Sequence, residues 1–301
     1  MFFTKFMDYL TFSKNKVLKI ESLTDDIIDF LTHYTNYSGL ALNRFKWNFS
    51  KEYELIDSFY IEKILYFVGA IALIKTENRG FMLARFNTID KHFNYFQEPT
   101  KIQAFDYYTG ESLGEYTEDN FVIIANNPFW YPTNITVWNI CAKLANLDRA
   151  VTINTFSQQT PILCQGDEKQ KIALQNAAAQ IEEGARYIFA PKDSPIKDIT
   201  TLDIRAPFVA KDLLDVSDRL KASLLTLLGI NNENVNKQSG VSPDEVNSNN
   251  SLVQFSSEVF VLSRQRAIAE IKRKFNIDVE LIDNYAKDVK TESQTQEGGE
   301  E

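Results

Sequence analysis

Two segments of this 301-residue chain carry a narrow apolar stripe at helical spacing, and they constrain the fold more than any other feature. The first stripe follows Pro132 and comprises Val137, Ile140, Leu144, Leu147 and Val151. The second follows Pro207 and comprises Val209, Leu213, Val216, Leu220, Leu224 and Leu227. Each stripe predicts a helix packed on other helices, and Gly229 is the expected end of the second. Together the stripes need more apolar partner surface than the helices of one subunit offer, so we expect copies of the chain to form a closed ring.

The rest of the chain mixes helical and strand patterns, which predicts the α+β class. Helical spacing indicates one helix over Ser22–Gly39, with the glycine as its expected stop. Over about Tyr60–Val122, apolar runs alternate with turn signals, which is typical of a small, mostly antiparallel β subdomain. Its most apolar run, Ile64–Ile74, is too short to span a bilayer and predicts a buried strand or a helix end.

The second half of the chain continues this mixture. Between the two stripes, Pro161–Ser194 has the pattern of a strand, a helix and a strand, which predicts a compact αβ insert. A further helix is expected over Leu252–Phe275, and a strand in the sequence IDVELI at Ile277–Ile282. The tail, KTESQTQEGGEE, is too polar to fold.

The charge balance excludes a protein that is basic over its whole surface and binds nucleic acid tightly for that reason. Forty-one acidic and 32 basic side chains give a formal net charge of −9, so any contact with nucleic acid must be local or weak. The two cysteines, Cys141 and Cys164, lie in apolar surroundings. We interpret them as reduced core thiols, with a disulfide as the less favoured alternative.

The sequence contains no motif that predicts catalysis. The phosphate-loop, dinucleotide, zinc-protease, serine-hydrolase, CxxC and EF-hand patterns are absent, so we expect no enzymatic activity and no cofactor. His33 and His92 are far apart in sequence and favour packing or surface roles over metal ligation. The acidic pairs Asp25-Asp26 and Glu182-Glu183 suit a helix start and a helix face. The basic run Lys272–Lys274 could bind phosphate, but it ends a predicted helix, where cations complement the dipole.

A polar segment interrupts the helical pattern abruptly. Leu227–Asn250, with the sequence LLGINNENVNKQSGVSPDEVNSNN, lies between two predicted helices and holds seven asparagines from Asn231 onward. Asparagine, glycine and proline favour turns, so the segment predicts an exposed loop. The first twenty residues are mildly basic and rich in aromatic side chains, which is compatible with an arm that contacts a partner.

Several short strings, in this order along the chain, resemble the portal (upper-collar, head–tail connector) proteins of small short-tailed bacteriophages. The strings are Phe45-x-Trp47, IEK at Ile61–Lys63 with Gly69, VIIANNPFWYPT at Val122–Thr133, NTFSQQTPIL at Asn154–Leu163, RYIFA at Arg186–Ala190, APFV at Ala206–Val209, LLGINNENVNK at Leu227–Lys237, DEVNSNN at Asp244–Asn250 and SSEVFVLSRQRA at Ser256–Ala267. Each string is a mixture of common residues, and their collinear order over more than two hundred residues carries the resemblance.

The resemblance implies a ring of twelve subunits around a channel through which the genome is pumped. Each subunit would be a portal-type α+β fold with a helical stem, a small αβ clip and a mixed wing that contains the β subdomain. The implied divisions are an N-terminal arm and wing at 1–132, a stem helix at 133–157, the clip at 158–205, a stem helix at 206–229, a tunnel loop at 230–247, a C-terminal wing helix and strand at 248–285, and a disordered tail at 286–301.

The resemblance also implies where DNA would meet the chain, because the family has its tunnel loop after the last stem helix. We expect a mobile polar collar that touches the phosphate backbone without reading bases; an ordinary surface loop is the alternative. The candidate channel residues are Arg205, Lys211, Asn231, Asn232, Asn234, Asn236, Lys237 and Gln238. The acidic neighbours Asp203 and Asp212 would weaken a basic ring at the first two of these positions.

The partners that the resemblance implies are copies of the chain, double-stranded DNA bound without sequence preference, a packaging ATPase docked on the clip near Asp193–Asp203, the major capsid and scaffolding proteins, and the lower-collar or tail protein. The expected location is the capsid vertex of the virion, with assembly in the host cytoplasm. Some relatives bind a packaging RNA through a basic N-terminal arm; this N-terminus is more hydrophobic, so that role is not carried over. Two other hypotheses are an acidic-site phage nuclease and a monomeric adaptor, and size-exclusion chromatography would separate a ring from both.

Overall fold

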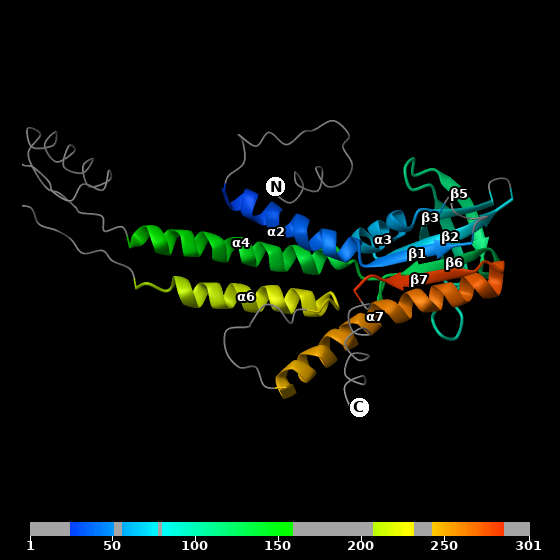
Figure 1. The fold of residues 1–301 in the computed structure, drawn as a ribbon. Coiled ribbons are helices and arrows are strands. Elements are labelled where there is room, and N and C mark those ends of the chain that lie inside the picture. Colours follow the sequence, from blue (N-terminus) through cyan, green and yellow to red (C-terminus); the bar gives the residue numbers. More distant parts are fainter. Residues whose placement is uncertain (1–24, 51–55, 78–79, 159–206, 232–242, 286–301) are drawn as a thin grey trace, which may run out of the picture. The chain divides into compact units, whose positions relative to one another are not determined.

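The computed structural model describes residues 25–50, 56–77, 80–158, 207–231 and 243–285, with the backbone alone at 157 and 243–250. The chain divides into two compact units, Met1–Asn146 with Ser217–Glu301, and Leu147–Val216. Two long helices, α4 (Thr133–Ser157) and α6 (Ala210–Leu227), contribute to both units. Helices and antiparallel sheets occur together (Figure 1), which confirms the α+β class.

A five-stranded antiparallel sheet forms the predicted β subdomain of the first unit. Its strands are β2 (Ala70–Thr76), β3 (Gly80–Thr88), β4 (Lys101–Phe105), β5 (Ser112–Thr117) and β6 (Phe121–Ala125), in the spatial order β5-β4-β3-β2-β6, with the short 3-10 helix η3 (Glu118–Asn120) before β6. Successive side chains of a strand point to opposite faces: Ile71 and Leu73 join one core, and Ala72 and Ile74 join another. All four are fully buried, so both faces of β2 are covered here, and this is why the strand is apolar from Ala70 to Ile74.

The apolar run Ile64–Ile74 contains both a helix end and a buried strand. Helix α3 (Ser58–Phe67) begins after Asp57, whose carboxylate accepts the N–H of Phe59. Gly69 then turns the chain into β2 with a φ of +96°. A Cβ at this glycine would lie 2.0 Å from the carbonyl oxygen of Trp130, so the turn requires glycine.

A second, two-stranded sheet joins distant parts of the chain. Strand β1 (Phe45–Phe49) pairs antiparallel with β7 (Val279–Asp283), which is the strand expected in IDVELI. Helix α7 (Pro243–Phe275) contacts β6 and β7 (Figure 1). The core shared by α3, α7 and the two sheets comprises Trp47, Ile61, Ile64, Leu65, Ile71, Leu73, Val122, Ile124, Ala267, Ile271 and Ile277.

The helical core of the first unit is formed by α2 (Asp25–Leu42), the first part of α4 and the last part of α6. The predicted stop at Gly39 is wrong, because α2 continues to Leu42. A Cβ at Gly39 would meet nothing within 4 Å, and Leu40 and Leu42 pack against the core. Burial of the last turn therefore outweighs the low helix propensity of one glycine.

Helices form at both positions where the apolar stripes predicted them, but the two stripes differ in burial. The first stripe is buried in the core at Val137, Ile140 and Leu144. In the second stripe Leu224 is fully buried, whereas Val216 and Leu227 are each 46% exposed. The second helix thus leaves apolar side chains on the surface of the described chain.

The polar interruption is shorter than predicted at its far end. Helix α7 begins at Pro243 rather than at Leu252, so residues 243–247 of the expected tunnel loop have helical backbone. Proline suits the first turn of a helix, and the acidic residues Asp244 and Glu245 favour its positive end. The predicted N-terminal arm, the αβ insert Pro161–Ser194, the polar tail and residues 232–242 lie outside the described residues.

Candidate functional site

The predicted channel residues fall only partly within the described chain. Lys211 is exposed in the first turn of α6, next to the exposed Asp212, and Asn231 is exposed just after Ile230. The other candidates, Arg205, Asn232, Asn234, Asn236, Lys237 and Gln238, lie outside the described residues. Their role in a channel stays a prediction.

The polar segment begins at the end of α6, and the structure describes in detail how this helix end is held. Leu228 donates its N–H to the carbonyl of Leu224 (2.9 Å), and Ile230 donates to the carbonyl of Leu225 (2.9 Å). Between them Gly229 has a φ of +65°. This hydrogen-bond pattern closes a helix on a glycine and confirms the predicted stop. Because Leu228 and Ile230 are buried, both sides of the glycine are anchored in the core.

Gly229 also lies in close contact with α7. A Cβ at this position would lie 2.7 Å from the Cα of Ser257 and 2.6 Å from Nη1 of Arg44. A backbone atom such as that Cα cannot move away as the end of a flexible side chain can. Both the left-handed conformation and the close approach of α7 therefore require glycine here.

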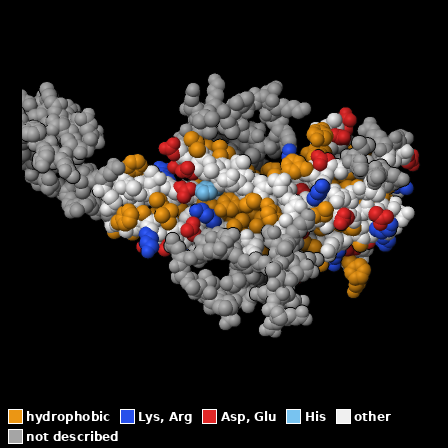
Figure 2. Space-filling view, viewed as in Figure 1, with side chains coloured by type: hydrophobic (Ala, Val, Ile, Leu, Met, Phe, Trp, Pro, Cys, Tyr) orange, Lys and Arg blue, Asp and Glu red, His pale blue; other side chains and the backbone are white. Residues whose placement is uncertain are grey.

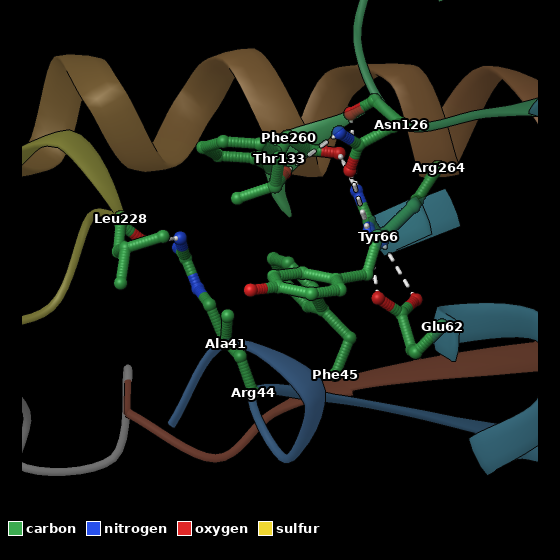
Figure 3. A pocket seen from close by; sticks show the side chains of 10 residues that line it. All are labelled: Ala41, Arg44, Phe45, Glu62, Tyr66, Asn126, Thr133, Leu228, Phe260 and Arg264. Carbon is green, nitrogen blue, oxygen red and sulfur yellow. Dashed lines mark hydrogen bonds and ion pairs between the residues drawn. The ribbon is translucent and has the colours of Figure 1, made fainter. Parts of the chain in front are cut away.

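Arg44, two residues after α2, holds this end of α6 in place (Figure 3). Its Nη1 donates to the carbonyl oxygen of Leu228, and its Nη2 donates to Oγ of Ser257 and, at 3.0 Å, to Oδ2 of Asp283. The side chain of Arg44 is 3% exposed. Burial lowers the pKa of Arg44, and the hydrogen bond with Asp283 opposes that shift. The side chain joins α6, α7 and β7 and places a cation at the carbonyl end of α6, where the helix dipole favours one.

A second buried arginine, Arg264 of α7, pairs with Glu62 of α3. Its Nε and Nη2 donate to the two carboxylate oxygens at 2.9 and 2.7 Å, the two-point geometry in which arginine binds carboxylates most specifically. Trp47 donates its ring N–H to the same carboxylate at 2.7 Å. Both charged side chains are 3% exposed, so loss of either partner would leave an uncompensated buried charge.

Arg264 also reaches the entry to α4. Its Nη1 donates to the backbone carbonyl of Asn126 at 3.2 Å. Asn126 in turn donates its side-chain N–H groups to Oγ1 of Thr133, the first residue of α4, and to the carbonyl of Tyr131, both at 2.8 Å. The start of α4 is therefore linked to α7 through one asparagine.

The ring of Phe45 connects the two arginines. The guanidinium carbons of Arg44 and Arg264 lie 4.5 and 4.3 Å from its centroid, within cation–π range. Figure 3 shows these side chains around a small pocket that Tyr66 and Phe260 also line. Each arginine is paired with a carboxylate, so this arrangement suits mechanical connection rather than proton transfer or nucleophilic attack. We call Arg44, Phe45, Glu62, Gly229 and Arg264 the junction cluster.

In the second unit a neutral clamp joins α4 to the residues before α6. Asn154 is 8% exposed; its Nδ2 donates to the carbonyl of Pro207 at 2.8 Å, and its Oδ1 accepts the N–H of Val209 at 3.0 Å. One amide thus holds the backbone on both sides of Phe208. The start of α6 is fixed to α4 through this side chain.

The basic run at the end of α7 is paired with acidic neighbours. Lys272 contacts Asp278 at 2.7 Å, and Arg273 and Lys274 contact Glu270 at 2.6 and 3.5 Å. This agrees with the interpretation of the run as a helix end. On the face that Figure 2 shows, basic and acidic side chains of the described residues are interspersed.

Among the described residues, no group of three or more His, Cys, Asp or Glu could hold a metal ion. His33 is half-buried on α2 and His92 is exposed between β3 and β4. Cys141 is a buried free thiol, and burial raises its pKa to about 12. No helix within the described ranges is both long and apolar enough to cross a membrane.

Comparison with known proteins assigns the family. A sequence model of the family described as Phage Connector (GP10) matches residues 13–289. The chain belongs to this phage connector family. Connectors are structural proteins of the virion that assemble as oligomeric rings at the capsid vertex and join capsid and tail.

Two solved structures are similar to the connector chain. One is a chain from the portal and tail of native bacteriophage P68, with 17% identity and a TM-score of 0.44, covering 85% of this chain and 86% of that one. The other is an HK97-family phage portal protein from Corynebacterium diphtheriae, with 8% identity and a TM-score of 0.42, covering 88% of this chain and 95% of that one.

Sequence reasoning missed the junction cluster, although one signal for it exists. Arg264 lies three and seven residues before the buried Ala267 and Ile271, so a charge stands on the core-facing side of a helix. A charge at such a position needs a buried partner. The sequence does not say that this partner is Glu62, about two hundred residues away.

Proposed function

We propose that twelve copies of this connector chain form a closed ring around a channel for double-stranded DNA, and that the ring serves packaging, retention and ejection of the genome. In this proposal α4 and α6 are the stem helices, and residues 158–205 form the clip. The two sheets and α7 belong to the wing, and the tunnel loop, expected at 230–247, is residues 230–242, because 243–247 belong to α7.

The observation that supports this best is the fixed end of α6. A polar segment that cannot bury itself begins at a glycine held by a buried arginine, the backbone of α7 and two core side chains. A loop that must keep its place while DNA moves past it needs such a rigid base. An ordinary surface loop needs no charged buried anchor, whose desolvation is costly.

The DNA contacts in this proposal are weak and repeated. Strong phosphate contacts would resist sliding, because each contact must break at every step. The net charge of −9 suits weak contact, as does the acidic Asp212 beside Lys211. Arg205 and Lys237 would add basic positions along the channel, and the asparagines from Asn231 onward would touch the backbone without reading bases.

The proposed partners follow from the same assignment. A packaging ATPase would dock on the clip near Asp193–Asp203, the wing would contact the major capsid and scaffolding proteins, and the lower-collar or tail protein would bind outside the capsid. Assembly would take place in the host cytoplasm. We assign no packaging RNA to the N-terminal arm.

The chain itself would have no catalytic activity, so the energy for packaging would come from the separate ATPase. The test is magnesium-dependent hydrolysis of ATP and of DNA by the purified ring. No turnover above that of a buffer control is expected. Hydrolysis that a single substitution in this chain abolishes would support the nuclease hypothesis instead.

Deletion of residues 232–242 tests the role of the loop. The deletion removes no residue of either apolar stripe, so folding and ring assembly should be retained. In proheads, motor-driven entry of DNA should continue at least partly, whereas packaged DNA should slip back or leak. A variant that carries a glycine–serine segment of equal length is the matched control for chain connectivity. Lys237→Ala should have a smaller effect, because one exposed contact per subunit is screened by salt.

The deletion can show in two different ways that the assignment of this segment as the tunnel loop is wrong. Rings that retain full-length DNA as well as the unmodified protein would show that the segment is not the tunnel loop. Rings that fail to form would place the segment in the contact between subunits.

A further inference from the structure

The outward face of α7 changes character along the helix. In its middle part, Leu252, Phe255, Val259 and Leu262 are 58, 65, 45 and 57% exposed. These residues are three, four and three positions apart, so they form one continuous apolar stripe along the helix. At 1.5 Å per residue the stripe is about 15 Å long. We call these four residues the α7 stripe.

The second half of the same helix shows what a solvent-facing side looks like in this protein. There Gln265, Arg266 and Ala269 are exposed, and they are followed by the ion-paired Lys272 and Arg273. The apolar character of the outward face over residues 252–262 is therefore not a general property of the helix. Scattered exposed apolar residues need no explanation, but four in one line on a single helix indicate a contact surface.

The opposite side of α7 is already occupied within its own unit. Ser257 accepts a hydrogen bond from Arg44 and lies against Gly229, and Arg264 is buried against Glu62. The helix cannot turn its stripe inward without breaking these contacts. The stripe must therefore be covered from outside the described part of the subunit or remain in water.

We propose that the α7 stripe is the apolar centre of the contact between neighbouring copies of this chain in the ring. This proposal rests on the ring assembly stated above. A ring is closed by a head-to-tail contact, in which each copy offers one surface to the next and a different surface to the previous one. A stripe at helical spacing fits a groove between side chains of a facing helix, and the exposed apolar positions on α4 and α6 are surfaces of that kind.

The stripe is the centre and not the whole of this contact. A stable interface buries about 800 Å² on each partner, which is more than four side chains provide. Affinity in such interfaces is concentrated in a few central residues, and aromatic side chains are prominent among them. Phe255, the most exposed of the four and the largest, is the expected anchor.

Matched charge insertions on α7 test the proposal in the full-length chain. The variant Phe255→Glu/Leu262→Glu adds two negative charges to the stripe. The control Gln265→Glu/Ala269→Glu adds the same two charges to the outward face of the second half. The fraction of chain in rings is measured by sedimentation over a range of concentrations, and helix content by circular dichroism. We expect at least a tenfold rise in the concentration needed for half assembly in the stripe variant, and less than a twofold change in the control.

A crosslinking measurement keeps the test independent of folding defects. With p-benzoylphenylalanine at position 255 in otherwise unmodified rings, illumination should give covalent dimers of the chain. The same probe at position 265 should give few. Dimers from position 255 support the proposal. Crosslinks within a single chain, or only to capsid or scaffolding protein in assembled particles, would overturn it.

The outcomes also distinguish this inference from the proposed function. Intact rings of the stripe variant at unchanged concentration would overturn the α7 contact and leave the ring assembly standing. An unmodified chain that stays monomeric would overturn both.

Discussion

The two ends of α6 are held in different ways. At the start, one neutral amide, Asn154, makes two hydrogen bonds to the backbone beside Phe208. At the end, Arg44 binds the carbonyl of Leu228 and the side chains of α7 and β7, and Gly229 lies against the backbone of α7. Removing one partner from a buried charged network costs more than removing a neutral hydrogen bond. The end of α6 that leads into the polar segment is therefore held by the costlier contacts to break.

The largest expected effect in this comparison comes from Arg44→Met. The substitution keeps much of the side-chain volume but leaves Asp283 and the carbonyl of Leu228 without their charged partner. We expect a loss of about 3–5 kcal/mol in the free energy of unfolding, measured with denaturant at fixed subunit concentration. Arg44→Lys, which keeps the charge but not the planar fork, should lose less. A loss below about 1 kcal/mol for Arg44→Met would show that the charged network does not fix this helix end.

Gly229→Ala should follow, with a loss of more than about 2 kcal/mol. The left-handed conformation alone costs about 1–2 kcal/mol for an L residue, and the added Cβ would also overlap the backbone of Ser257. The matched control is Gly39→Ala, where φ is not positive and no atom lies within 4 Å of the added Cβ. That change should stabilise α2 by about 0.5–1 kcal/mol. Thermal midpoints that move in the same direction for both variants would contradict the geometry.

Asn154→Ala should have a smaller effect, since it removes two neutral hydrogen bonds worth about 1 kcal/mol each. Its control is Thr152→Ala, an exposed position on the same helix, which should change stability by no more than about 0.5 kcal/mol. Hydrogen exchange at the N–H of Val209 measures the clamp directly. Unchanged protection of this N–H in the Asn154 variant would show that the amide is not its partner in solution.

Sequence patterns predicted the local elements of this fold better than the contacts that fix them. The leucine stripe and Gly229 were sufficient to predict α6 and its end, because periodicity and left-handed glycine are local signals. Gly39 was misleading, because burial of the following turn outweighs propensity. Arg44 could not be predicted as an anchor, since its partners Leu228 and Asp283 are 184 and 239 residues away. The start of α7 was predicted too late because asparagines near Pro243 favour loops.

At neutral pH the smallest effect on stability is expected from the ionisation of the Cys141 thiol. This residue lies in the helical core together with Leu224, Leu228 and Ile230. Burial raises its pKa to about 12, so the neutral thiol is favoured in the folded state. Its contribution to stability is fully present below the usual thiol pKa of 9.0 and is lost as the pH rises toward 12. In a Cys164→Ser background, alkylation at pH 8.5 should be roughly a hundredfold or more slower than in unfolded chain. Arg44→Met should accelerate the alkylation of Cys141 if that substitution opens the end of α6. Asn154→Ala should leave the alkylation rate unchanged.

Native mass spectrometry of the purified unmodified chain tests the central claim most directly. The chain has a mass of 34.6 kDa, and the account predicts one dominant species of twelve copies at micromolar concentration and physiological salt. A closed ring with a different number of subunits would correct the stoichiometry and leave the connector function intact. A species that remains at 34.6 kDa up to high micromolar concentration would contradict the account.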